Sequence, residues 1–440
     1  METEIRKIVG VIEIPQDKIS FFQKEIKNIS DFKKKINSVL AENATEILEV
    51  ILGGTIILNS SDIHIEPEEK KAKIRSRIDG ILQDIIFFDL KIHQLLISRI
   101  KLLSGLKLNI TDRPQDGRFS IILPSLNKEV VSIEVRTSAL PSEYGETIVL
   151  RILNPKSLIN LEDLGLREDL LKLFEKEIKK PNGMIIVTGP TGSGKTTTLY
   201  AFLNKIQTPE IKIITIEDPI EYHLKGISQT QVEPEKGYDF ANGLKSIMRQ
   251  DPDVILVGEV RDLETANIGL QAALTGHLVF TTLHTNDAAG TIARLINLGA
   301  KLADIGPAIN LAVAQRLLRR VCKKCSKMEK ISIPVLNKIK KGLAKIPKEI
   351  KMPKLDEKLM VSKAIGCSNC NLTGYKGRLG IFEVFLVDDE IEKFILTSPA
   401  IASLKEKAIE KGMITMYQDG LIKVIEGKTT LEEVERATGE

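Results

Sequence analysis

Aromatic side chains are scarce in this chain. Its 440 residues include no tryptophan, and phenylalanine and tyrosine bring the aromatic content to only 4%. Because single-stranded nucleic acid is usually bound by aromatic side chains interleaved with basic ones, this scarcity argues against a nucleic-acid groove. The net charge of +4 is also too small, over this length, to indicate a polyanionic partner by itself. Composition therefore disfavours a nucleic-acid translocase, and we expect no nucleic-acid partner.

Long apolar runs are absent as well. No stretch of about 18 apolar residues is present to cross a bilayer. The charged N-terminus, Met1 to Lys7, lacks the apolar core of a signal peptide. We therefore expect a cytosolic protein. Because one hydrophobic core rarely serves 440 residues, we also expect two or three domains.

Cysteine is limited to two pairs of identical spacing, Cys322-x2-Cys325 and Cys367-x2-Cys370. In a cytosolic protein, such pairing favours a metal over disulfides. Four thiolates fill the tetrahedral shell of zinc and leave no open position, so the pattern predicts structural Zn²⁺ without a catalytic part. A thioredoxin-like redox pair is the alternative, but it would be expected near a strand-to-helix junction early in a βαβ unit.

The hydrophobic pattern changes several times along the chain and predicts six regions. Residues 43–153 are predicted as a small α+β domain, because Asn43 is an N-cap residue before a helical pattern and residues 61–66 and 72–78 alternate as strands do. Later, short apolar runs alternate with helical segments, which is typical of a parallel sheet covered on both faces. These runs are Met184–Thr188, Ile211–Ile216, Val254–Val257 and Leu278–Thr282. The full division is a short basic arm (1–42), the α+β domain (43–153), a linker (154–166), the α/β core (167–318), a cysteine-bracketed insert (319–382) and a helical C-terminal region (383–440).

A glycine-rich segment after the first apolar run matches the pattern G-x4-G-K-[ST]. It stands between a strand and a helix-forming stretch, which is the context that this motif requires. Glycines let backbone N–H groups surround phosphates, Lys195 reaches the β- and γ-phosphates, and Thr196 is a ligand for Mg²⁺. The segment therefore predicts binding of Mg-ATP, the alternative being a chance glycine-rich turn. Its residues are Gly189, Pro190, Thr191, Gly192, Ser193, Gly194, Lys195 and Thr196, with Thr197 following.

Polar residues stand where the other apolar runs stop, and ligands bind at the carboxyl ends of parallel strands. Glu259 suits a magnesium ligand, and Glu217 suits a carboxylate that orients or deprotonates the attacking water. For either glutamate the alternative is a solvated strand end. His277 and His284 flank the last run. They either sense the γ-phosphate or are ordinary hydrogen-bonded histidines.

Lysine dominates the segment between the two cysteine pairs. Residues 323–358 hold twelve lysines against four acids. Such a run is usually a solvated face. Its position in the cysteine-bracketed insert also motivates the hypothesis that it docks on an acidic partner or on anionic lipid.

Taken together, these motifs resemble those of the secretion motor ATPases of type II secretion and type IV pilus assembly, from about Ala44 onward. The combination is far more specific than the glycine-rich loop alone. The matching segments are 61–67 (SDIHIEP) and 75–80 (RSRIDG) for that family's PAS-like N-terminal domain, 217–221 (EDPIE) for its aspartate box, 249–262 for its atypical Walker B, 275–286 for its histidine box and 367–380 for its second zinc knuckle.

The resemblance implies a fold and a set of roles. It implies a RecA-like P-loop ATPase domain with a mostly parallel sheet, behind a PAS-like α+β domain. Lys195 and Thr196 would hold phosphates and magnesium, Glu217 would be the catalytic carboxylate, and Glu259 would be the Walker B acid. In such motors, arginines of the N-terminal domain approach nucleotide across a subunit boundary, and a surface ion pair is the alternative role for each. The candidates here are Arg75, Arg77, Arg118 and Arg136.

The function implied is that of a homo-hexameric cytoplasmic motor, peripheral to the membrane, that powers type IV pilus assembly through an inner-membrane platform protein. The equivalent motor of type II secretion is the alternative. Retraction motors generally lack the four cysteines, so these favour assembly or export. A nucleotide-gated scaffold without turnover is disfavoured because Lys195 and both glutamates are present.

Two departures from the family pattern are visible. Residues 1–42 are too short for the further docking domain that many members carry, which leaves open how this motor would be recruited. Lys245 stands four positions before Arg249, where relatives often have arginine. Because lysine lacks the planar fork of arginine, we expect a different contact geometry at that position.

Overall fold

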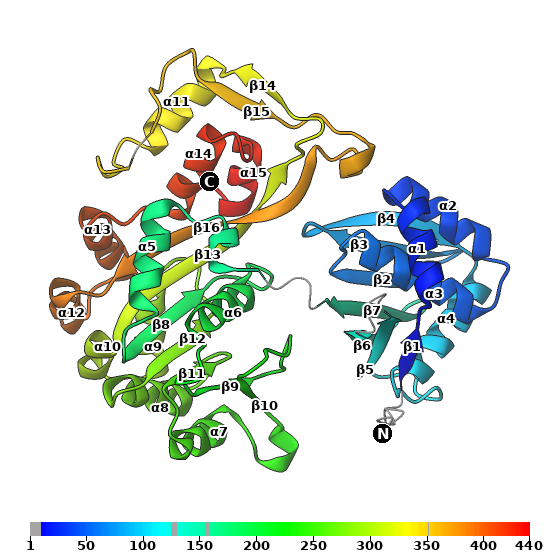
Figure 1. Ribbon diagram of the computed structural model, residues 1–440, viewed down its shortest axis with the longest axis horizontal. Helices are drawn as coiled ribbons and strands as arrows, with labels where there is room; N and C mark the ends of the chain where they lie inside the picture. The colour runs from blue at the N-terminus through cyan, green and yellow to red at the C-terminus, as the bar shows by residue number, and fades with distance from the viewer. Residues whose placement is uncertain (1–9, 125–129, 155–158, 351) are drawn as a thin grey trace. The chain divides into compact units, whose positions relative to one another are not determined.

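The computed structural model describes residues 10–124, 130–154, 159–350 and 352–440 (Figure 1). These residues form two compact units, each with its own large sheet. The first unit contains residues 10–154 together with 322–325 and 365–376, and the second contains the remaining described residues. Within the described part of the chain, no helix combines the length and hydropathy that a bilayer crossing requires.

The first unit is built on a sheet in the order β1-β5-β6-β7-β2-β3-β4. All of its pairings are antiparallel except that of β1 with β5. Its strands are β1 (Val11–Glu13), β2 (Asp62–Pro67), β3 (Ala72–Ile78), β4 (Ile81–Phe88), β5 (Gln115–Pro124), β6 (Val130–Ser142) and β7 (Gly145–Leu153). Its helices are α1 (Gln16–Glu25), α2 (Ile29–Val39), α3 (Ala44–Ile57) and α4 (Leu90–Leu103).

The first forty residues differ from the expected basic arm. Their described part forms β1, α1 and α2, and buries Phe22 and Phe32 in the core of the first unit. Both rings pack so closely on α3 that a Cβ at Gly53 would lie 2.5 Å from Phe22, and one at Gly54 would lie 2.2 Å from Phe32. Exposed lysines such as Lys24, Lys33 and Lys34, on the outer faces of these short helices, hide the amphipathic pattern in the sequence.

The second unit is built on a sheet in the order β10-β9-β11-β12-β8-β13-β16. Every pairing from β10 to β13 is parallel. Its strands are β8 (Gly183–Thr188), β9 (Ile213–Glu217), β10 (Ser228–Gln231), β11 (Val254–Val257), β12 (Leu278–Leu283), β13 (Ile309–Val321) and β16 (Tyr375–Leu386). A separate two-stranded ribbon pairs β14 (Lys327–Lys330) with β15 (Met360–Lys363).

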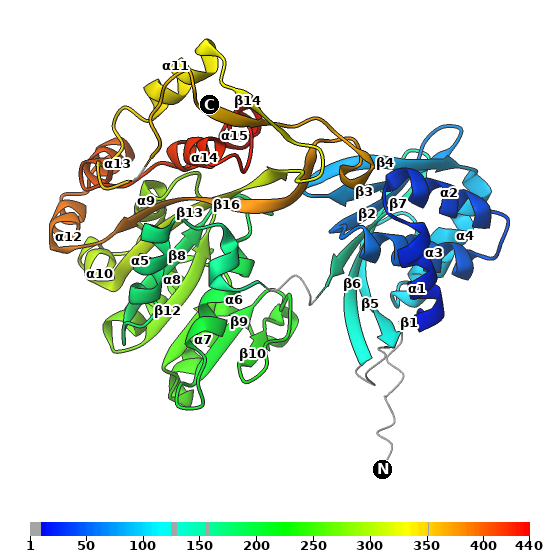
Figure 2. The ribbon, with the colours of Figure 1, turned by 45° about the horizontal axis from the view of Figure 1, so that its top comes forward.

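Helices cover both faces of this parallel sheet (Figure 2). In β8, Met184 and Ile186 belong to a core with α7, α8 and α9, whereas Ile185 and Val187 belong to a core with α5 and α6. The prediction of a mostly parallel sheet covered on both faces is therefore confirmed. The helices of this unit are α5 (Glu168–Glu177), α6 (Lys195–Ile206), α7 (Phe240–Ile247), α8 (Leu263–Leu274), α9 (Ala289–Leu298), α10 (Leu302–Ala308), α11 (Ile333–Gly342), α12 (Asp389–Leu396), α13 (Ile401–Glu410), α14 (Met416–Ile425) and α15 (Leu431–Thr438).

Two strands that the sequence did not reveal flank the cysteine-bearing segment. We expected an insert over residues 319–382, but β13 continues to Val321 and β16 begins at Tyr375, and the two are neighbours in the large sheet. The segment between them therefore leaves and re-enters one sheet. Arginines in β13 and glycines in β16 obscure the strand pattern in the sequence.

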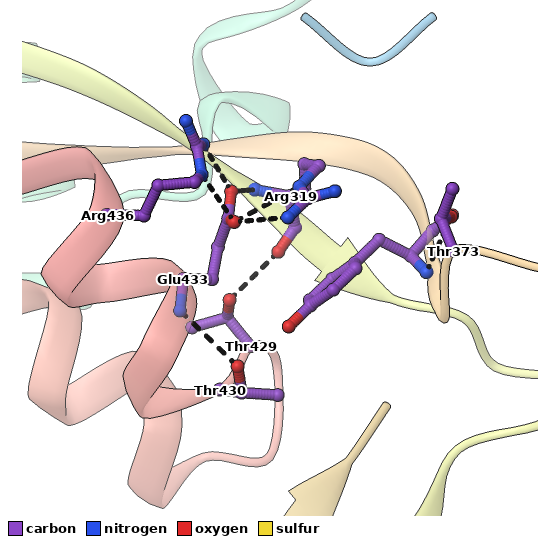
Figure 3. Close-up of polar contacts among 7 residues, drawn as sticks. Arg319, Thr373, Thr429, Thr430, Glu433 and Arg436 are labelled. Carbon is purple, nitrogen blue, oxygen red and sulfur yellow. Dashed lines mark hydrogen bonds and ion pairs between the residues drawn. The ribbon is translucent and has the colours of Figure 1, made fainter. Parts of the chain in front are cut away.

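A buried carboxylate fixes the last helix on β13, and Figure 3 shows its contacts. Glu433 of α15 accepts hydrogen bonds from the guanidinium and backbone N–H of Arg319 and from Arg436. The Thr429 hydroxyl donates to the Arg319 carbonyl at 2.9 Å. Burial alone would raise the pKa of Glu433, but hydrogen bonds from Arg436 and Arg319 outweigh it and lower the pKa to about 2.

We predict that Glu433→Gln lowers the free energy of unfolding by about 2 kcal/mol at pH 7, because both arginines lose a charged acceptor. Since the folded-state pKa is depressed, this contribution is complete above about pH 4.5 and disappears as the pH falls towards 2. Urea unfolding at several pH values measures it. Glu432→Gln, on the exposed side of the same helix, is the matched control. Equal stabilities of the two variants at pH 7 would contradict the assignment.

Candidate functional site

The carboxyl ends of four parallel strands lie level with one another in the second unit. Val257 of β11 pairs with Ile216 of β9 and Thr281 of β12, and Leu283 of β12 pairs with Thr188 of β8. The residues that follow these strands therefore gather at one edge of the sheet. They include the glycine-rich loop after β8, Glu217 at the end of β9, Glu259 after β11 and His284 after β12.

The glycine-rich loop needs its glycines. Gly189, Gly192 and Gly194 have φ values of 146°, 78° and 90°, a region that favours residues without a side chain. A Cβ at Gly189 would also lie 2.5 Å from the Gln315 carbonyl oxygen of β13. The buried Ser193 hydroxyl has no hydrogen-bond partner among the described residues. A glycine-rich loop at a helix start, together with an unsatisfied buried hydroxyl, fits a bound phosphate chain.

Lys195 opens α6, and its side chain turns back over the loop. Its Nζ donates to the Gly189 carbonyl oxygen at 2.8 Å. Burial lowers the pKa of Lys195, while the nearby charges of Glu259 and Glu221 oppose that effect. Thr196 and Thr197 follow in the first turn of the same helix, and both are partly buried.

Glu259 and His284 are brought together. The His284 Nε2 lies 3.4 Å from Oε2 of Glu259, and Arg261 pairs with the other carboxylate oxygen. Arg261 also lies 3.3 Å from the carboxylate of Asp218, which follows β9. The hydrogen bond to Glu259 is the main cause that raises the pKa of Arg261. Glu259 therefore lies at the strand edge between His284 and Arg261, with its side chain 16% exposed.

Glu217 has a different environment, because only 3% of it is exposed. Its carboxylate accepts hydrogen bonds from Tyr200, Thr215 and Gln229. Burial raises the pKa of Glu217, and these three hydrogen bonds oppose the shift. The acid assigned to the attacking water is thus held inside the sheet edge, whereas Glu259 lies nearer to solvent.

His277 lies at the opposite end of β12 from His284. Its carbonyl accepts from the N–H of Gly183, which begins β8, and its Nδ1 lies 3.1 Å from the Ala272 carbonyl oxygen. Six strand residues separate the two histidines, and a strand rises about 3.3 Å per residue. The structure therefore does not bring His277 to the glycine-rich loop of its own chain. For His277, the alternative of an ordinary hydrogen-bonded histidine fits the geometry.

The four candidate arginines share one face of the sheet in the first unit. Arg118 of β5 pairs with Arg136 of β6, while Arg75 and Arg77 lie two positions apart on β3. The opposite face carries the buried core, so all four side chains project from the face without helices. Arg75 pairs with Glu66, and Arg77 lies 3.2 Å from Asp62.

A further arginine of this face, Arg151, was not among the candidates from the sequence. Arg151 of β7 pairs with Arg136 on one side and with Asp62 on the other, and its Nε donates to Asp62 at 3.0 Å. Five cross-strand neighbours form a line across the sheet: Arg118, Arg136, Arg151, Asp62 and Arg77. We call this line the arginine row. The register of β7 with β6 and β2 shows that Arg151 joins the others.

The four cysteines form a compact cluster. The four Sγ atoms of Cys322, Cys325, Cys367 and Cys370 lie within 4.8 Å of one another, and none is in a disulfide. The Cys370 Sγ is 3.8 Å from those of Cys325 and Cys367. A tetrahedral zinc with bonds of about 2.3 Å separates its sulfurs by roughly 3.8 Å, so these donors fit zinc.

We predict that Cys370→Ser abolishes stoichiometric zinc, because three thiolates and a hydroxyl bind the ion far more weakly. Elemental analysis of protein purified without added metal measures the zinc content, and melting temperature gives an independent readout. Ser368→Ala, an exposed position between two ligands, is the control and should keep both properties. Full zinc occupancy in Cys370→Ser would contradict the assignment.

Comparison with known proteins gives a consistent result. The family described as "Type II/IV secretion system protein" matches residues 40–436. The type IV pilus assembly ATPase PilB of Myxococcus xanthus (strain DK1622) is 39% identical over 419 residues, which are 95% of this chain and 71% of that protein. The type II secretion system ATPase E of Vibrio cholerae (serotype O1, El Tor Inaba N16961) is 42% identical over 398 residues, 90% of this chain and 75% of that protein.

A solved structure shares the fold. A crystal structure of the pilus retraction motor PilT with bound ADP superposes with a TM-score of 0.57 at 27% identity. The match covers 88% of this chain and 95% of that one.

Proposed function

This chain belongs to the Type II/IV secretion system protein family, and from that premise we propose that it is the ATP-hydrolysing motor of a type IV pilus assembly machine. The proposal rests on the set of residues that meet at the carboxyl ends of the parallel strands. There, the glycine-rich loop with its Lys195, Glu259 and His284 come from three separate segments of the chain. Only a ligand that needs a phosphate cradle, a cation and a carboxylate together would use this set.

The loop residues are assigned to the phosphates of ATP. Backbone N–H groups of residues 191–197 would surround the phosphate chain, and the Ser193 hydroxyl would gain a partner. Lys195 would exchange its contact with the Gly189 carbonyl for the β- and γ-phosphates. Thr196 and Glu259 would hold Mg²⁺, which when bound neutralises charge on the phosphate oxygens.

The two glutamates are assigned different parts of the hydrolytic step. Glu217 is proposed to orient or deprotonate the attacking water, and Glu259 to hold Mg²⁺, directly or through water. His284, which contacts Glu259, is proposed to respond to the γ-phosphate. The arginine row and Arg75 are proposed to reach the nucleotide of a neighbouring copy, where guanidinium groups stabilise the charge that develops on the γ-phosphate.

The oligomeric state is proposed from the role of these arginines. Arginines that act from one copy on the next imply a head-to-tail contact, which can close into a ring. We propose a homo-hexamer in the cytoplasm that acts on an inner-membrane platform protein. The relative named PilB supports pilus assembly for this family, and the relative named ATPase E supports type II secretion. Complementation of deletion strains for either machine distinguishes the two systems.

We predict that Lys195→Ala and Glu259→Gln each reduce steady-state phosphate release at least about a hundredfold, because each removes charge that the transition state needs. A coupled phosphate assay with Mg-ATP measures it. Lys212→Ala is the control and should leave the rate unchanged, because Lys212 precedes β9 at the end away from Glu217 and its Nζ donates to the Gln250 carbonyl. Phosphate release by Lys195→Ala at the wild-type rate would contradict the proposed function.

Membrane contact is proposed for the lysine-rich segment. Of the twelve lysines in residues 323–358, the eleven that the structure describes are all exposed, and Lys338 pairs with Glu435 at 2.7 Å. Exposed lysines contribute about 1 kcal/mol each near an anionic surface.

We therefore predict that changing Lys323, Lys324, Lys327, Lys340, Lys341 and Lys345 to glutamine weakens co-sedimentation with phosphatidylglycerol vesicles. Binding of the unchanged protein should itself fall with increasing salt. Six lysine changes outside this segment, at Lys24, Lys70, Lys71, Lys91, Lys107 and Lys179, serve as the charge-matched control. Equal vesicle binding by the two variants would contradict the proposed membrane contact.

A further inference from the structure

Tyr200 connects the glycine-rich loop to Glu217. It lies on α6, five positions after Lys195, and only 1% of it is exposed. Its hydroxyl donates a hydrogen bond to Oε2 of Glu217 at the end of β9. Tyr222 packs against its ring edge, with ring centroids 6.3 Å apart. A residue of the phosphate-binding helix therefore holds one oxygen of the buried acid.

The other oxygen of Glu217 is held from the sheet. Its Oε1 accepts from the Thr215 hydroxyl at 2.5 Å and from Gln229 Nε2, on β10, at 3.2 Å. The same Gln229 amide donates to the Tyr222 carbonyl oxygen and accepts from the Leu224 N–H. Both oxygens thus accept hydrogen bonds from protein donors, and two of these donors belong to the strands β9 and β10.

Among these three donors, Tyr200 alone lies on a helix, α6, which begins at the glycine-rich loop. Any displacement of α6 when nucleotide binds changes the Tyr200 contact while the Thr215 and Gln229 contacts stay with their strands. Donors to a carboxylate favour its charged form, and they also fix the direction of its lone pairs. The position of α6 therefore affects both properties of Glu217.

We propose that Tyr200 is a positioning residue for hydrolysis, which couples occupancy of the glycine-rich loop to the orientation and proton affinity of Glu217. This rests on the proposed function, because its effect is read through ATP hydrolysis. Burial, and after it the charge of Glu217, raises the pKa of Tyr200 above its usual range, so the phenol keeps its proton. Besides Tyr200, Glu221 is the titratable group that acts on Glu217.

The test is the pH dependence of kcat for Tyr200→Phe. Removing a donor to the charged form raises the pKa of Glu217, so the acid limb should move upward by about one pH unit. On that limb kcat should fall about tenfold, while the KM for ATP should change less than about twofold. Thr215→Val should move the limb in the same direction. Tyr238→Phe is the control, because its hydroxyl contacts Thr230 and is not among the donors to Glu217.

A double-mutant cycle separates positioning from packing. If Tyr200 acts through Glu217, adding Tyr200→Phe to Glu217→Gln should change the residual kcat by less than about twofold. A further tenfold loss in that background, a pH profile of Tyr200→Phe that coincides with wild type, or a higher KM with an unmoved limb would each overturn the assignment. A wild-type protein that releases no phosphate would instead show that the proposed function itself is wrong.

Discussion

The parallel register of β9, β11, β12 and β8 is the constraint on which the site depends. Because the four strands end level with one another, polar residues from distant parts of the chain meet at one edge. The neighbouring strand β13 also restricts the glycine-rich loop, since a Cβ at Gly189 would lie 2.5 Å from the Gln315 carbonyl oxygen. Burial of the sheet on both faces holds this register in place.

Charge is distributed unevenly over that edge. Glu217 is enclosed by three donors, whereas Glu259 is shared between His284 and Arg261 near solvent. Carboxylates in such different surroundings differ in access to water, and paired acids in enzymes often divide their work in this way. The enclosed Glu217 is consistent with activation of water, and the more accessible Glu259 is consistent with a metal site.

Sequence patterns were sufficient where a local rule determines the structure. Continuous apolar runs predicted β8, β9, β11 and β12, and glycine spacing predicted the loop, because both depend only on neighbouring residues. They were insufficient for α1 and α2, whose lysines mask Phe22 and Phe32, and for β13, whose arginines mask a sheet strand. Cross-strand neighbours such as Arg151 and Asp62, and the helix-to-strand contact of Tyr200 with Glu217, depend on tertiary register, which no local pattern contains.

Amide hydrogen exchange with and without a slowly hydrolysed ATP analogue and Mg²⁺ tests the central claim most directly. The account predicts that nucleotide slows exchange in residues 189–200 and in the segments that begin at Glu217, Glu259 and His284, because they form one site. Residues near His277, at the far end of β12, should exchange at the same rate in both states. Protection confined to another region, or no protection at all, would contradict the account.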